Sequence, residues 1–239
     1  MIKYSLLLLT YNRLGVTARC LRSLAPMLHR EDVEWLIVDN ASSDGTAQWL
    51  LKVAARYPQM RLMLRSDNAG VAGGRQILLD AARGQTLIIL DSDVEARHPD
   101  WLERLTAPLR ERPEVWLCGP GGAFVTPDWT DYEAAPLGYA GPVDTISGFC
   151  QAFDRRVLDA GFRFDVRFNP RWHEDTDMSL FVQSKGGVVW HTGDVGLFHI
   201  FSYTGDDGTG AVKQQYLASK WRGQGLIRAE RERLAASTI

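Results

Sequence analysis

Apolar residues gather in short runs along the first part of the chain, and each run ends on polar residues. Four such runs predict buried strands, at residues 4–9, 35–38, 61–64 and 86–90. Between them apolar residues recur at helical spacing, which predicts helices over residues 14–28, 49–53 and 77–81. This alternation predicts an α/β fold with a mostly parallel, Rossmann-like central sheet flanked by helices.

The pattern becomes less regular after residue 93. A helix is predicted over residues 101–109 and a strand over 115–118, whereas residues 119–145 are rich in Gly, Pro and Asp. Residues 211–236 predict one polar C-terminal helix, with a middle weakened by Gly223 and Gly225. No obvious linker divides the chain, so we expect a single domain with a regular first half and a more irregular second half.

Composition and charge narrow the class of protein. The chain has 239 residues, of which 45% are apolar, and its formal net charge is −2. No run of Lys or Arg indicates a nucleic-acid partner. The apolar run at residues 6–9 is too short to span a membrane, and we expect no span elsewhere. Three widely spaced cysteines fit neither a disulfide framework nor a metal site, which favours a reducing, cytoplasmic location. Nothing in the sequence predicts the oligomeric state.

Two carboxylates follow the fourth predicted strand directly, in the sequence Leu87-Ile88-Ile89-Leu90-Asp91-Ser92-Asp93. Ligands of parallel sheets collect outside the carboxyl ends of the strands. Mg²⁺ and Mn²⁺ prefer carboxylate oxygens, and Mg²⁺ usually shares its shell with substrate phosphates. The motif therefore predicts a metal-diphosphate site. The alternative is a polar strand end that leads into a helix capped by an acid.

The other predicted strands also end on polar residues, in Thr10-Tyr11-Asn12, Asp39-Asn40 and Asp67-Asn68. Tyr11 is suited to stack on a nucleobase, and Asp39 is suited to accept an N–H group from it. Arg75 follows a glycine-rich turn, and a guanidinium group suits phosphate. The glycines match neither a Walker A motif nor a dinucleotide-binding fingerprint, which disfavours both of those folds.

A second acidic cluster lies downstream, in Trp172-His173-Glu174-Asp175-Thr176-Asp177. Carboxylates at a helix start oppose the positive end of the helix dipole, but three acids within four residues exceed that need. The excess favours a general base at this helix start. His199 is a candidate third metal ligand, and His191 competes with it.

These motifs, in this order, resemble those of family 2 glycosyltransferases with the GT-A fold. The resemblance runs from Leu6 to about Ser202. It implies that Asp175 is the catalytic base, that Glu174 is a second catalytic residue, and that Asp91, Asp93 and His199 bind Mn²⁺ or Mg²⁺. The donor-binding residues that it implies are Thr10, Tyr11, Asn12, Asp39, Asn68, Arg75, Asp91 and Ser92, and the acceptor-side residues are Ser147, Gly148 and Trp172.

The implied activity is metal-dependent, inverting and hexosyltransferase-like. A sugar would move from a nucleotide diphosphate donor, with UDP favoured, to the hydroxyl of a carbohydrate or other acceptor. The single domain of residues 1–239 would comprise a nucleotide-sugar-binding half (1–93), an acceptor half (94–205) and a C-terminal helical segment (206–239). The membrane helices and Gln-x-x-Arg-Trp element of processive synthases are not found, which argues against a polymer synthase.

Two other classes stay open. One is a nucleotide-sugar-binding protein without catalysis, because a fold does not guarantee an activity. The other is a haloacid-dehalogenase-type phosphatase, in which Asp91 would be the nucleophile, Asp93 an acid/base and Lys185 its lysine. Three strand–helix units precede the acidic motif, and Lys185 follows the second acidic cluster, which disfavours the phosphatase.

Overall fold

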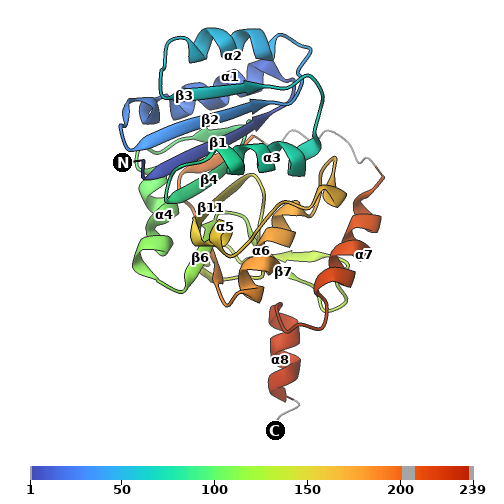
Figure 1. Ribbon diagram of the computed structural model, residues 1–239. Helices are drawn as coiled ribbons and strands as arrows, with labels where there is room; N and C mark the ends of the chain where they lie inside the picture. Colours follow the sequence, from blue (N-terminus) through green and yellow to red (C-terminus); the bar gives the residue numbers. More distant parts are fainter. Residues whose placement is uncertain (1, 201–207, 237–239) are drawn as a thin grey trace.

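A computed structural model describes residues 2–200 and 208–236. Its first half confirms the predicted parallel strands. Four strands run side by side in the order β3-β2-β1-β4 (Figure 1). Their bounds are β1 (Tyr4–Thr10), β2 (Val33–Asp39), β3 (Met60–Leu64) and β4 (Thr86–Asp91). β1, β2 and β4 are mostly buried because their apolar runs face helices on both sides of the sheet, whereas the edge strand β3 is only partly buried.

Helices connect these strands, with bounds that refine the predictions. They are α1 (Leu14–Leu24), α2 (Thr46–Ala54), α3 (Gly70–Ala81) and α4 (Trp101–Glu111). The helix predicted to reach residue 28 ends at Leu24, and the chain continues as a 3₁₀ helix, η1 (Ala25–His29). Pro26 explains this change, because proline cannot donate the next α-helical hydrogen bond.

The second half extends the same sheet. β11 (Cys150–Asp154) lies antiparallel between β4 and β6 (Val115–Gly119), and β12 (Val188–His191) follows in parallel to β6. The eight-stranded sheet ends at β9 (Gly141–Pro142). Because β11 and β9 pair antiparallel to their neighbours, the sheet is mixed but mostly parallel. Short strands complete this half: β5 (Val94–Ala96), β7 (Gly122–Val125), β8 (Tyr132–Ala134), β10 (Thr145–Ile146) and β13 (Leu197–His199).

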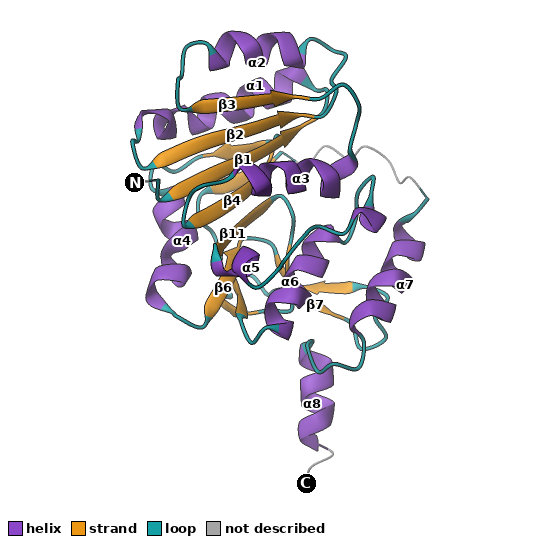
Figure 2. Cartoon of the chain, in the orientation of Figure 1, coloured by secondary structure: helices purple, strands orange, loops and turns teal. Residues whose placement is uncertain are grey.

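Helices cover both faces of the sheet (Figure 2), and an apolar layer lies between them and each face. One layer joins α1, α2 and α4 to side chains such as Leu8, Trp35 and Ile88. The other joins α3 to α5 (Arg156–Asp159) and α6 (Glu174–Ser184), over side chains such as Leu7 and Ile89. Neighbouring residues of a strand face opposite layers, as the alternation of strand side chains requires. A further 3₁₀ turn, η2 (Val166–Phe168), precedes α6.

The prediction of one C-terminal helix is wrong. The chain forms α7 (Gly210–Trp221) and α8 (Arg228–Ala236) instead. Gly223 and Gly225 between them have φ of 83° and 71°, angles that end a right-handed helix. α7 packs on the second half, whereas α8 extends away from it (Figure 1). None of the described helices is long and apolar enough to cross a membrane. The expected boundary between residues 205 and 206 lies outside the described residues.

Candidate active site

The predicted strand ends meet at one edge of the sheet. In the parallel pairing of β1 with β2, Thr10 lies opposite Asp39, and in the pairing with β4, Leu9 lies opposite Asp91. The two acids therefore flank the end of β1 on either side. This placement follows from the parallel register, which brings the carboxyl ends of neighbouring strands together.

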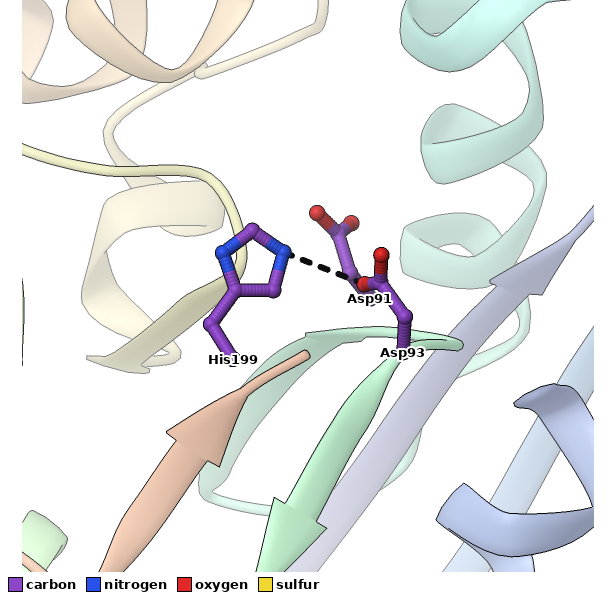
Figure 3. Close-up of side chains that lie close together, drawn as sticks. All are labelled: Asp91, Asp93 and His199. Carbon is purple, nitrogen blue, oxygen red and sulfur yellow. Dashed lines mark hydrogen bonds and ion pairs between the residues drawn. The ribbon is translucent and has the colours of Figure 1, made fainter. Parts of the chain in front are cut away.

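Asp91, Asp93 and His199 form a group that could hold a metal ion, since one ligand atom from each lies within 4.8 Å of the others. β13 pairs with β5 so that His199 lies opposite Val94, and this pairing returns the histidine to the acidic motif. The three side chains point toward one another, and His199 Nε2 lies 3.1 Å from Asp93 Oδ1 (Figure 3). Two carboxylates and one imidazole are a donor set that suits Mn²⁺.

The competing histidine lies elsewhere. His191 Nδ1 accepts a hydrogen bond from the backbone N–H of Gly122 at 3.1 Å, and its ring stacks on Tyr139. Of the two candidates, the structure brings only His199 to the acids among the described residues.

The charges around Asp93 favour its ionised form. Burial opposes ionisation, but the hydrogen bond and charge of His199 and the charge of Arg13 together lower the pKa of Asp93. Burial likewise opposes protonation of His199, and the bond to Asp93 outweighs it and raises the pKa of the imidazole. Arg13 Nη1 lies 3.5 Å from Asp93 Oδ2. The sequence reading missed Arg13, whose left-handed backbone turns its side chain toward the site.

Asp39 is buried with one carboxylate oxygen uncommitted. Its Oδ2 accepts from the backbone N–H of Ser42 at 3.0 Å, whereas its Oδ1 has no hydrogen-bond partner within the part of the chain that the structure describes. A buried acceptor without a partner is costly, so this oxygen is suited to a ligand N–H group. Tyr11 is 49% exposed at the end of the adjacent strand.

Three of the predicted donor residues hold loops in place. Asn12 accepts from the N–H of Ser43 at 2.8 Å, and Asn68 accepts from the side chain of Asn40 at 2.7 Å. Thr10 is buried, and its hydroxyl lies 3.2 Å from that of Thr17. These contacts order the turns that surround Asp39.

Arg75 lines the site but is almost entirely buried. Its side chain is 3% exposed, and it donates to Asp91 at 2.8 Å and to Glu174 at 3.0 Å. It also donates to the carbonyl oxygen of Gly148 at 2.8 Å. Burial raises the pKa of Glu174 to about 7, against the opposing charge of Arg75. Arg75, which the sequence predicted to bind phosphate, therefore joins the candidate metal ligand Asp91 to the second acidic cluster.

The acids of the second cluster have different surroundings. Asp175 accepts from the backbone N–H groups of Gly148 and Thr176, each at 2.7 Å. Asp177 is buried and accepts from Trp221 Nε1 at 2.7 Å and from Lys220. Asp177 thus anchors α7, whereas Asp175 and Glu174 both line the site.

One cavity of about 450 Å³ lies between candidate metal ligands and the second acidic cluster. Asp91 and His199 line it, and so does Asp175. The predicted acceptor residues Ser147, Gly148 and Trp172 line it as well. The ring of Phe149, which the sequence reading missed, also faces this cavity and stacks on His199 with the ring centroids 4.7 Å apart.

Comparison with known sequences identifies a family and relatives for part of the chain. Residues 5–162 match Glycosyl transferase family 2. Uncharacterized protein Rv1520 of Mycobacterium tuberculosis is 33% identical over 115 residues, which are 48% of this chain and 33% of that protein. Glycosyltransferase AglE of Haloferax volcanii is 27% identical over 101 residues, which are 42% of this chain and 33% of that protein. The matched region spans about a third of the length of these relatives.

Solved structures share the fold. Mannosyltransferase PcManGT from Pyrobaculum calidifontis, solved with GDP-Man and Mn²⁺, has a TM-score of 0.68 at 20% identity, over 85% of this chain and 58% of that one. GalNAc-T7, solved with UDP, GalNAc and Mn²⁺, has a TM-score of 0.70 at 17% identity, over 87% of this chain and 45% of that one. These similarities confirm the expected GT-A fold. Because the family match covers most of its residues, the chain belongs to glycosyl transferase family 2.

Proposed function

We propose that the protein is a metal-dependent, inverting glycosyltransferase that uses a nucleotide diphosphate sugar. The observation that carries this proposal is the single cavity lined by candidate metal ligands, Asp91 and His199, and by a candidate base, Asp175. A donor and an acceptor must meet in one enclosure for direct transfer, and this cavity supplies both kinds of group.

Asp91, Asp93 and His199 would hold Mn²⁺ or Mg²⁺ at the donor end. A bound divalent cation there would neutralise the charge that develops on the leaving diphosphate. Arg13 would add a second positive charge beside Asp93. Asp39 would accept an N–H group of the base, with Tyr11 stacked on it. Uracil offers such an N–H group, and so do guanine and thymine. UDP is the favoured donor nucleotide, and guanosine and thymidine diphosphates are the alternatives.

Asp175 would remove the proton from an acceptor hydroxyl as that oxygen attacks the anomeric carbon. The new glycosidic bond forms on the face opposite the departing diphosphate, so the configuration inverts. Backbone N–H groups of Gly148 and Thr176 orient the carboxylate for this step. In this assignment residues 1–93 bind the donor, and residues 94–205 provide most of the acceptor side, with Ser147 and Trp172 at the cavity wall.

A binding protein without catalysis is the second candidate. The uncommitted oxygen of Asp39 would serve nucleotide binding alone equally well. The phosphatase alternative loses support, because Asp91 pairs with buried Arg75 and Lys185 lies at the far end of α6 from Asp175.

The test of the proposal combines binding with turnover. UDP should bind more tightly with Mn²⁺ than with a chelator, as read by calorimetry, and Asp93→Ala should remove that difference. Release of nucleoside diphosphate from UDP-N-acetylglucosamine, UDP-glucose and GDP-mannose, with a panel of alkyl glycosides, reports transfer. Binding without release from any donor would favour the binding protein, and metal dependence that survives Asp93→Ala would reject the metal assignment.

A further inference from the structure

The chain enters helix α6 through an unusual backbone. Trp172 and His173 have φ of 84° and 70°, although neither is glycine. Residues with a Cβ atom rarely adopt left-handed angles, and such angles persist where surrounding contacts hold them. The carbonyl oxygen of His173 accepts from the N–H of Asp177 at 2.8 Å, which opens the helix. The same turn therefore sets the direction in which the Asp175 side chain projects.

Helix α7 supplies contacts that hold this turn. Lys213, which is 6% exposed, donates from Nζ to the carbonyl oxygen of Arg171 at 2.7 Å. The ring of His173 lies with Nε2 3.3 Å from the carbonyl oxygen of Gly210 and Nδ1 2.8 Å from the hydroxyl of Tyr132. The rings of His173 and Tyr132 also stack, with centroids 6.0 Å apart. The turn is thus fixed from outside α6.

The partners of His173 assign the proton on its ring. Burial lowers the pKa of His173 and raises the pKa of Tyr132, so both side chains are neutral at pH 7. A neutral imidazole has one N–H group, and the carbonyl oxygen of Gly210 can only accept. The carbonyl oxygen of Gly210 therefore favours the proton on Nε2, and Nδ1 lies 2.8 Å from the hydroxyl of Tyr132, which also lies 3.2 Å from Gln214 Oε1. Both ring nitrogens are committed to the protein, so His173 is not suited to exchange protons with a substrate.

We propose that Lys213 and His173 are positioning residues that aim Asp175 at the acceptor side of the cavity. The inference rests on the proposed function, in which Asp175 is the base. Lys213 holds the carbonyl group of Arg171, just before the turn. His173, the last residue before α6, is held through its own ring. Asp175 follows His173 by two positions. Positioning of this kind matters because misplacing a reacting group by about 1 Å can reduce turnover about 10²-fold.

The first experiment removes the ammonium group of Lys213 and keeps most of the stem, with Lys213→Met. Release of nucleoside diphosphate from UDP-N-acetylglucosamine or GDP-mannose should lose about 10-fold or more in kcat, while the donor KM stays within about twofold. Lys213→Arg should restore most of the kcat, because a guanidinium group also donates to a carbonyl oxygen. Lys52→Met, at an exposed position of α2, is the matched control and should behave as wild type.

Amide hydrogen exchange supplies a readout that does not depend on turnover. In Lys213→Met, peptides spanning residues 172–178 should exchange faster, while peptides of β1 and β4 keep their protection and so report an intact fold. Unchanged exchange at 172–178 would overturn the proposal, and so would faster exchange with wild-type kcat. If the wild type releases no nucleoside diphosphate, the proposed function fails by itself, and the exchange rates still decide whether α7 holds the start of α6.

Discussion

At the scale of single residues, the acids around the cavity differ in what neutralises them. Asp91 and Glu174 share Arg75, Asp93 contacts His199 and Arg13, and Asp177 contacts Lys220. Asp175 instead accepts hydrogen bonds from backbone N–H groups, which orient the carboxylate without supplying a full positive charge. Because Asp175 lines the cavity with its carboxylate held in this orientation, it stays the proposed base.

Asp175→Asn tests that assignment. The amide keeps the shape of the carboxylate but cannot take the proton, so turnover should fall by about 10²–10⁴-fold. The affinity for UDP in the presence of Mn²⁺ should stay near that of wild type, since Asp175 makes its contribution in the transition state. Steady-state rates and calorimetry on the same preparation measure the two effects. Wild-type turnover in the variant would show that Asp175 is only a helix-capping acid.

Glu174 should give the folded protein a characteristic pH dependence. Its pKa is about 7 in the folded state, against 4.5 for an ordinary glutamate. Between these values the folded protein holds a proton that the unfolded chain has released. The contribution of Glu174 to the free energy of unfolding therefore falls as pH rises through that window.

Thermal melting of wild type and Glu174→Gln across this window isolates the effect. The variant should lack the decline, because glutamine keeps the acceptor for Arg75 but does not titrate. Glu31→Gln, at the exposed surface, is the control and should keep the wild-type slope. Parallel melting curves for wild type and Glu174→Gln would contradict the raised pKa.

At the scale of elements, the positions of the strand ends can be predicted from the sequence, whereas the backbone conformation at the start of α6 cannot. Apolar runs define parallel strands, and parallel strands end at one edge, so Asp39 and Asp91 could be assigned to the cleft. Trp172 and His173 carry no local signature of left-handed backbone, and Lys213, one residue that holds this turn, lies 42 positions from Arg171. Arg75 likewise finds Glu174 99 positions away, which local spacing cannot reveal.

The turn between β10 and β11 tests how closely the elements fit. A Cβ atom added at Gly148 would lie 2.8 Å from Arg75 Nη1 and 3.2 Å from Asp175 Cβ. Gly148→Ala should therefore displace the base and lower turnover about 10-fold or more, by the same sensitivity to misplacement. Gly15→Ala is the matched control, because a Cβ atom there meets nothing within 4 Å. Equal kcat values for the two variants would count against close packing at this turn.

At the scale of the whole molecule, Arg75 joins the two halves. It lies on α3 in the first half and pairs with Glu174 on α6 in the second. Arg75→Met would leave Asp91, which is partly exposed, and Glu174, which is buried, without their cation. Breaking a buried pair such as that with Glu174 costs about 3–5 kcal/mol of unfolding free energy. Urea unfolding measures this loss.

The matched change for Arg75→Met is Arg19→Met, which removes a surface partner of Glu95. An exposed pair of this kind is worth about 0–1 kcal/mol. Similar urea midpoints for the two variants would show that Arg75 does not stabilise the contact between the two halves.

The antiparallel pairing of β4 with β11 has a consequence for how such a chain can diverge. Cys150 lies opposite Leu90, and the N–H of Asp91 donates to the carbonyl oxygen of Phe149 at 2.9 Å. A one-residue insertion or deletion here would slip the register and reverse which face each side chain meets. Extra residues near Leu137, a fully exposed loop position, would leave that ladder untouched. Length changes at such outer loops would therefore leave the spacing between the candidate metal ligands and the proposed base unchanged.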